Sequence, residues 1–329
     1  MEREKLLQVK NLNAYFKTEN GMVQAVKDVS FEVRKGELMA LVGESGCGKS
    51  ITSLSIMGLG AKNCVVKADS IRLGDKELVG LKPKELRKMR GKDMAMIFQE
   101  PLTSLNPLFT IGFQLMEAIR LHNKVTKKKA REMAIEILTK VEIPRPESIL
   151  NEYPNALSGG MRQRVMIAMA LVNNPKVLIA DEPTTALDVT IQAQILSLMR
   201  PLMKDSGTSI LFITHDLGVV AEIADYVMVM YAGQMVENGT VHDIFHNPLH
   251  PYTQGLMNST IRIDQSDEKL QIIPGTVPTL TDMPDGCRFH PRCPYATEEC
   301  RTNAQGMMDA GDGRMVRCYR WKEIGGEKK

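Results

Sequence analysis

The chain has 329 residues, 43% of them hydrophobic, which is enough for about two globular domains with a sizeable core. Its formal net charge of +3 is too small to indicate a nucleic-acid partner. The sequence holds no apolar run of about 18 residues and its charged N-terminus lacks an apolar signal region, so we expect no membrane span and no export signal.

The first predicted elements are strands. Residues 7–10 and 29–33 alternate apolar and polar side chains, the pattern of half-buried strands, and Asn20-Gly21 between them is a strong turn signal. Residues 38–42 form a continuous apolar run, which is typical of a strand buried on both faces. A glycine-rich loop and an apolar helical stretch from Ser50 follow this strand.

A helical block is predicted over about residues 101–164. One apolar stripe at helical spacing is formed by Ala130, Met133, Ala134, Ile137, Leu138 and Val141. We expect Pro144 and Pro146 to close this helix. Residues 177–180 and 210–214 are further buried strands, so strands alternate with helices. This alternation predicts an α/β core with a mostly parallel sheet, into which the helical block is inserted.

Prolines become frequent after about residue 247. They stand at positions 248, 251, 274, 278, 284, 291 and 294. Such a shift in composition predicts a linker followed by a small loop-rich module.

The glycine-rich loop matches the phosphate-binding pattern. It consists of Gly43, Glu44, Ser45, Gly46, Cys47, Gly48, Lys49 and Ser50. Glycines let successive backbone N–H groups point at phosphate oxygens, and the helix that begins here adds its positive end. Lys49 is expected to reach the β- and γ-phosphates, and Ser50 to offer its hydroxyl to Mg²⁺. The buried strand before the loop and the helix after it supply the context that this pattern requires.

Two carboxylates, Asp181 and Glu182, end the apolar strand at 177–180. Asp181 at the strand tip can hold Mg²⁺, and Glu182 can act as the general base that polarises the attacking water. Taken alone, the pair is equally consistent with two carboxylates in an exposed turn. A phosphate loop in the same chain favours the catalytic interpretation.

A second anion-binding segment is formed by Leu157-Ser158-Gly159-Gly160, ahead of a helix. Ser158 is a good N-cap, and Gly159 and Gly160 permit close backbone approach to an anion. Such a site is redundant within one subunit, but it makes sense if it serves a nucleotide bound to another subunit.

The order of these motifs resembles the nucleotide-binding subunit of ABC transporters over about residues 6–255. The resemblance also includes Gln99, Ala186-Leu187-Asp188 and His215. It implies an ATPase with a RecA-like core, a helical subdomain at about 99–164, and a head-to-tail dimer. In such a dimer each ATP lies between one phosphate loop and the partner's Ser-Gly-Gly segment.

The same resemblance implies roles for single residues. Gln99 contacts Mg²⁺ and senses a transmembrane partner, His215 contacts the γ-phosphate, and Asp188 crosses the dimer interface. The nucleotide site also includes Ile51. Phe16 is the expected aromatic that stacks on adenine, with Tyr15 as the competing candidate because neighbours on a strand face opposite ways. Met161 stands where the family usually has glutamine.

The C-terminal part, residues 256–329, resembles the extension of oligopeptide and dipeptide importer ATPases. The resemblance lies in residues 250–256, in Gly286-Cys287 and in residues 291–294. It implies an ATPase at the cytoplasmic face of the cell membrane, bound peripherally to permease subunits and a second ATPase subunit, and serving an extracytoplasmic peptide-binding protein indirectly. The alternative is a soluble ABC ATPase of DNA repair or translation, but such proteins usually carry two cassettes or a long coiled coil.

Four cysteines with the spacing Cys-x5-Cys-x6-Cys-x17-Cys lie in this part: Cys287, Cys293, Cys300 and Cys318. Four thiolates from loops can hold a [4Fe–4S] cluster or a structural Zn²⁺. Zinc sites usually show closer pairs, and the family resemblance favours the iron–sulfur cluster; free thiols, disulfides and a redox-sensing role remain alternatives. We expect the cluster to be structural and separate from ATP hydrolysis, because no nucleotide motif lies in this part.

Overall fold

The computed structural model describes residues 3–19, 21–99, 104–184, 188–259 and 273–324. The chain divides into two compact units. Unit 1 comprises residues 1–7, 33–37 and 73–213, and unit 2 comprises residues 8–32, 38–72 and 214–329.

Parallel strands form the centre of unit 1. They are β7 (Met94–Ile97), β8 (Val177–Asp181) and β9 (Ser209–Thr214), in the order β7-β8-β9. Every residue of β8 and β9 is buried, as the continuous apolar runs predicted. The register places Asp181 opposite Ile213, at the carboxyl end of both strands.

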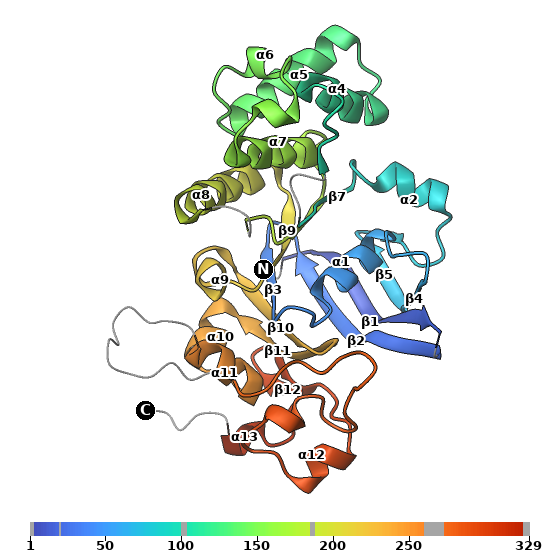
Figure 1. The fold of residues 1–329 in the computed structure, drawn as a ribbon, viewed down its shortest axis with the longest axis vertical. Helices are drawn as coiled ribbons and strands as arrows, with labels where there is room; N and C mark the ends of the chain where they lie inside the picture. The colour runs from blue at the N-terminus through green and yellow to red at the C-terminus, as the bar shows by residue number, and fades with distance from the viewer. Residues whose placement is uncertain (1–2, 20, 100–103, 185–187, 260–272, 325–329) are drawn as a thin grey trace. The chain divides into compact units, whose positions relative to one another are not determined.

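Helices make up the remainder of unit 1. They are α2 (Pro83–Met89), α4 (Ile111–His122), α5 (Lys127–Lys140), α6 (Pro146–Ile149), α7 (Gly159–Leu171) and α8 (Val189–Ser206), with the short β6 (Lys76–Glu77) and the 3₁₀ turn η1 (Pro154–Ala156). Figure 1 shows α4, α5, α6 and α7 as one bundle, so helices lie within the predicted block, although α7 continues beyond residue 164 to Leu171.

Helix α5 buries the predicted apolar stripe, but its end differs from the prediction. The hydroxyl of Thr126 caps it by accepting from the Lys129 N–H, and the helix ends at Lys140. Pro146 instead stands in the first turn of α6, where its missing N–H costs no intrahelical bond.

Unit 2 contains a second set of strands. The chain runs through β1 (Lys5–Thr18), β2 (Gly21–Arg34), β3 (Leu38–Val42), α1 (Lys49–Met57), β4 (Cys64–Lys67), β5 (Ser70–Leu73), α9 (Leu217–Ile223), β10 (Tyr226–Tyr231), β11 (Gln234–Thr240), α10 (Val241–His246) and α11 (Pro251–Asn258). Strand β3 is buried throughout and pairs in parallel with β10, while β10 and β11 form an antiparallel hairpin. Asn20 of the predicted turn lies outside the described residues.

We call residues 273–324 the cysteine segment. It contains η2 (His290–Arg292), α12 (Glu298–Thr302), β12 (Met308–Gly311), β13 (Arg314–Val316) and α13 (Trp321–Ile324). The composition predicted a loop-rich module, but β13 pairs antiparallel with β11, and β12 pairs with β13. The segment therefore extends the sheet of unit 2.

Candidate functional site

The predicted phosphate loop connects β3 to α1 in unit 2. Gly43 has φ 153°, and a Cβ added there would lie 2.2 Å from the backbone oxygen of Met230, so a larger residue cannot be accommodated. Gly48 occupies the N-cap of α1 with φ 103° and supplies no side-chain cap. The first turn of α1 thus presents the positive end of its dipole at this loop, which suits an anionic ligand.

Lys49 is held beneath the loop. Its side chain is buried, and its Nζ donates to the backbone oxygens of Gly43 at 2.7 Å and Glu44 at 3.1 Å. A buried ammonium held by carbonyl oxygens is pre-positioned for a phosphate group. Burial raises the pKa of the neighbouring Cys47 thiol, which agrees with a small neutral residue rather than a metal ligand.

Asp181 and Glu182 stand at the carboxyl end of β8. Both are buried, and Glu182 has a left-handed backbone with φ 46°. The N–H of Glu182 donates to the oxygen of Ile213 at 2.9 Å, which holds this conformation. Such strain costs about 1–3 kcal/mol and is found where function requires it. The exposed Gln99 donates from Nε2 to the Glu182 carboxylate at 3.1 Å, so the structure brings these two predicted residues together.

The Ser-Gly-Gly segment opens α7. The Ser158 hydroxyl caps the helix by accepting from the Met161 N–H, as predicted, and Ser158 and Gly159 are exposed. At Gly160 an added Cβ would lie 2.9 Å from Cγ2 of Ile191, so this glycine permits close approach to α8.

Asp188 caps α8. Its carboxylate accepts from the Ile191 N–H at 3.0 Å, and the residue is exposed. Ala186 and Leu187 of the same motif lie outside the described residues.

His215 and the aromatic pair belong to unit 2. His215 is exposed and directly follows β9. Tyr15 and Phe16 are half-buried neighbours on β1. The Tyr15 hydroxyl accepts from Gln24 at 3.2 Å, and the Lys67 ammonium lies 5.8 Å from its ring centre. These contacts hold Tyr15, and the choice of Phe16 for adenine stays a prediction.

The predicted nucleotide residues are thus divided between the units. Unit 2 holds the phosphate loop with Ile51, His215 and the aromatic pair, whereas unit 1 holds Gln99, Ser158, Gly159, Gly160, Asp181, Glu182 and Asp188. Their assembly into one site is implied by the family resemblance.

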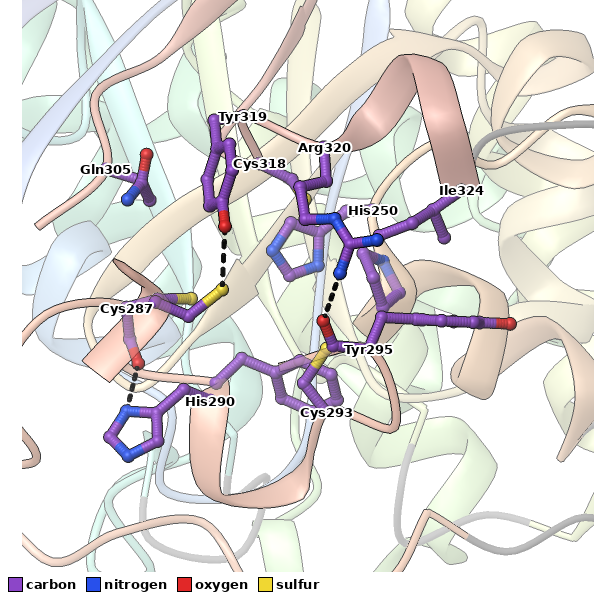
Figure 2. Close-up of a pocket in the computed structure, with 13 residues that line it drawn as sticks. His250, Cys287, His290, Cys293, Tyr295, Gln305, Cys318, Tyr319, Arg320 and Ile324 are labelled. Atoms are coloured by element: carbon purple, nitrogen blue, oxygen red, sulfur yellow. Dashed lines mark hydrogen bonds between the residues drawn. The ribbon is translucent and has the colours of Figure 1, made fainter. Parts of the chain in front are cut away.

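All four predicted cysteine ligands line one pocket in unit 2 (Figure 2). His250, Phe289 and Tyr319 are among the other residues that line it. The Cys287 N–H donates to the oxygen of Cys300 at 2.8 Å, which ties the Cys287 loop to α12. The sequence therefore predicted four cysteine side chains that the fold brings to one pocket.

The four thiols differ in acidity. Burial raises the pKa of Cys287, that of Cys293 to about 12 and that of Cys318 to about 11. Burial also opposes ionisation of Cys300, but its hydrogen bonds with Thr297 and Tyr319 outweigh the effect of burial, so the pKa of Cys300 is lowered. A redox sensor needs an accessible thiol of low pKa, and among these four thiols only that of Cys300 has a lowered pKa.

The iron–sulfur assignment is not confirmed. Among the residues that the structure describes, no group of three or more His, Cys, Asp or Glu side chains is arranged to hold a metal ion. The cluster therefore stays a prediction, as does zinc.

Comparisons with known proteins give the family. A family model described as "ABC transporter" matches residues 26–185, and one described as "Oligopeptide/dipeptide transporter, C-terminal region" matches residues 236–300. The oligopeptide transport ATP-binding protein AppD of Bacillus subtilis (strain 168) is 55% identical over 327 residues, covering 98% of this chain and 99% of that protein. The chain belongs to the family of ABC transporter ATP-binding subunits.

Further relatives place this ABC ATPase among the peptide-transport members of the family. The dipeptide transport ATP-binding protein DppD of Escherichia coli (strain K12) is 49% identical, covering 95% of this chain and 96% of that protein. DppD of Bacillus subtilis (strain 168) is 51% identical, covering 96% and 95%.

Solved structures confirm the P-loop cassette fold of this ABC ATPase. The dimeric, post-hydrolysis ATP-binding cassette MJ0796 bound to ADP and Pi has a TM-score of 0.64 and 28% identity, covering 71% of this chain and 98% of that one. The transporter component cbiO1 from Clostridium perfringens has a TM-score of 0.62 and 27% identity, covering 74% and 91%.

Two functional contacts of the ABC ATPase were missed by sequence reasoning. The Tyr252 hydroxyl accepts from the N–H of Glu44 at 2.9 Å, and Arg292 pairs with the Glu44 side chain. Both residues lie in segments that carry the family resemblance, but no local pattern shows that they reach a loop more than 200 positions earlier. Residues of the C-terminal part therefore contact the phosphate loop, while the expectation that the cluster takes no part in ATP hydrolysis stays a prediction.

Proposed function

We propose that this chain is the ATP-hydrolysing subunit of an ABC importer that couples ATP binding and hydrolysis to uptake of dipeptides or oligopeptides. The observation that carries the proposal is the match to peptide-transport ATP-binding proteins over nearly the whole chain, the C-terminal region included. None of the relatives named above is a repair or translation protein, so the alternative of a soluble ATPase finds no support.

The proposed nucleotide site has one set of residues that binds this chain's own ATP and another set that meets the ATP of a second subunit. The phosphate loop, Lys49 and Ser50 would hold the triphosphate of ATP. Ser50, Gln99 and Asp181 offer the oxygen ligands that Mg²⁺ prefers, and Mg²⁺ would neutralise phosphate charge there. Phe16 would stack on adenine, and His215 would contact the γ-phosphate.

Glu182 is the proposed general base. Its carboxylate is buried at the strand end and accepts from Gln99, so one of its oxygens is already oriented. A positioned carboxylate can take the proton of the attacking water. Gln99 would then connect the base to the transmembrane partner whose state it senses.

Ser158, Gly159, Gly160 and Asp188 are proposed to meet the nucleotide of a second ATPase subunit; Gly160 is half-buried and the other three are exposed. Exposure of Ser158 and Asp188 at helix starts supports this, because backbone N–H groups there can bind an anion from another chain. The dimeric state of MJ0796 supports it as well.

The proposed partners are transmembrane permease subunits at the cytoplasmic face of the cell membrane, with an extracytoplasmic peptide-binding protein acting through them. No described helix of the chain is long and apolar enough to cross a membrane. We further propose the domain division 1–255 and 256–329, with the helical subdomain at about 99–164.

For the cysteine pocket we propose a [4Fe–4S] cluster held by Cys287, Cys293, Cys300 and Cys318, with Zn²⁺ as the alternative. Four thiols on one pocket are the donor set that such clusters use. Zn²⁺ stays the alternative because four cysteine thiolates can also hold a structural zinc ion. When bound, the cluster would cross-link the loops of the segment.

The test of the proposed function is peptide uptake. The chain would be co-purified with its membrane subunits and reconstituted into vesicles with the binding protein, ATP and labelled di- to pentapeptides. We expect ATP-dependent uptake that Glu182→Gln abolishes. Association with membrane subunits that transport no peptide would contradict the proposal.

A further inference from the structure

A bidentate ion pair joins the cysteine segment to the phosphate loop. Arg292 donates from Nη1 to Oε2 of Glu44 at 2.7 Å and from Nη2 to Oε1 at 3.0 Å. The Arg292 side chain is 4% exposed and that of Glu44 is 32% exposed. Buried fork geometry of this kind is among the stronger polar contacts in proteins.

The guanidinium of Arg292 is itself held in place. Its Nε donates to the backbone oxygen of Pro274 at 2.8 Å, its Nη2 contacts that of Ile273 at 3.3 Å, and it lies 5.7 Å from the ring centre of Tyr231. Burial opposes the charge, but the hydrogen bonds to Glu44 and Tyr231 outweigh it and the pKa of Arg292 is raised. Arg292 is therefore a fixed cation aimed at Glu44.

Glu44 is in turn fixed at three points within the loop. Its N–H donates to Tyr252 at 2.9 Å, its backbone oxygen accepts from Lys49 at 3.1 Å, and its carboxylate binds Arg292. The same residue therefore supplies one of the two carbonyls that position the Lys49 ammonium and the carboxylate that Arg292 holds.

Charge gives the pair a second effect. An unpaired carboxylate in this loop would repel the phosphates that the loop is proposed to bind, and at a partly exposed position this repulsion is only partly screened. The Arg292 guanidinium neutralises Glu44 and leaves Lys49 and the α1 terminus to act on the phosphates.

We propose that Arg292 is a positioning residue for nucleotide binding: through Glu44 it holds and neutralises the phosphate loop, so the cysteine segment sets the affinity of the loop for a nucleoside triphosphate. This inference rests on the proposed role of the loop. Arg292 directly precedes Cys293, so any change that loosens the cysteine pocket reaches the loop through one residue.

The test measures the dissociation constant of ATP by calorimetry on the full chain, with Arg292→Gln made in two backgrounds. In the wild-type background we expect the dissociation constant to rise about tenfold or more, because a charge-assisted pair is lost and a carboxylate is left unpaired. In a Glu44→Gln background the same substitution should change it less than about threefold, because the charge to be neutralised is gone. Equal effects in both backgrounds, or no effect in either, would overturn the proposal.

Control variants distinguish a failure of this proposal from misfolding and from a wrong assignment of the phosphate loop. Arg301→Gln removes an exposed arginine of the same segment, paired with Glu298 at 3.8 Å, and should leave ATP affinity unchanged. If Arg292→Gln does not fold, Arg292→Lys keeps the charge without the fork and should raise the dissociation constant about threefold in the wild-type background only. ATP binding that survives Lys49→Ala would contradict the loop assignment itself, whatever Arg292 does.

Discussion

Two sets of residues expected to meet a nucleotide differ sharply in burial. Lys49, Asp181 and Glu182 are buried, whereas Ser158 and Asp188 are exposed. Burying charge is costly unless each group is bonded, and the loop carbonyls and Gln99 provide such bonds. The exposed residues Ser158 and Asp188 stay in contact with water, so they need no such bonds to offset a cost of burial. The difference agrees with the proposed roles, in which the buried residues act on this chain's own nucleotide and the exposed residues meet a partner's. We call the first set the interior half-site and the second set the surface half-site.

Glu182→Gln should have the largest effect on the interior half-site. The amide keeps the shape but loses basicity, so turnover should fall about 10²–10⁴-fold while ATP affinity stays near wild type. Steady-state hydrolysis and calorimetry measure the two effects. Glu117→Gln, on the exposed face of α4, is the matched control. Hydrolysis at the wild-type rate would show that Glu182 is not the base.

Lys49→Ala tests how tightly the interior half-site binds ATP before the reaction. It removes a buried cation from the phosphates before and during the reaction, so ATP affinity should fall about tenfold to a hundredfold together with turnover. The exposed Lys62→Ala serves as the control and should bind ATP normally. Unchanged affinity of Lys49→Ala in calorimetry would argue against the loop as the phosphate site.

Ser158→Arg tests the exposed residues that are proposed to meet a partner's nucleotide. A long cation at this exposed N-cap should block a partner's nucleotide without touching the interior half-site, so ATP binding to the monomer stays within about twofold of wild type. Dimerisation and hydrolysis should be lost. Ser148→Arg, at another exposed helical position of unit 1, should leave both intact. A monomeric mutant that hydrolyses ATP at the normal rate contradicts a composite site.

The cysteine pocket should have the smallest effect on hydrolysis. Anaerobically purified protein is expected to be brown and to contain about four irons per chain, as measured by metal analysis and absorption. Cys318→Ser should lower the yield or loosen the segment, because metal-binding energy is folding energy, while turnover at saturating ATP stays within about threefold of wild type. Stoichiometric zinc without iron would replace the cluster by zinc, and four freely alkylated thiols in folded metal-free protein would exclude both.

The residues that could be predicted from the sequence are those whose role is encoded locally. The strand at 38–42, the loop after it and the carboxylates after residues 177–180 each follow from neighbouring residues. The structure places the strand at β3, the loop between β3 and α1, and the carboxylates at the carboxyl end of β8. The Ser158 cap follows from the same local chemistry.

Contacts between distant segments could not be predicted in this way. Pairing of β13 with β11 and the Arg292–Glu44 ion pair depend on tertiary packing, which no periodicity or turn signal reports. The end of α5 was misplaced for a related reason. The prolines at 144 and 146 predict the end of the helix, but α5 already ends at Lys140, and Pro146 lies in the first turn of α6.

The most direct test of the two half-sites is ATP-dependent association of the Glu182→Gln chain, together with the second ATPase subunit of its transporter if that is a different protein. Light scattering after size exclusion would compare this variant with the double variant that also carries Ser158→Arg. We predict a stable dimer with ATP for the first and an ATP-bound monomer for the second. Equal dimerisation of both variants would contradict the assignment of Ser158 to a partner's nucleotide.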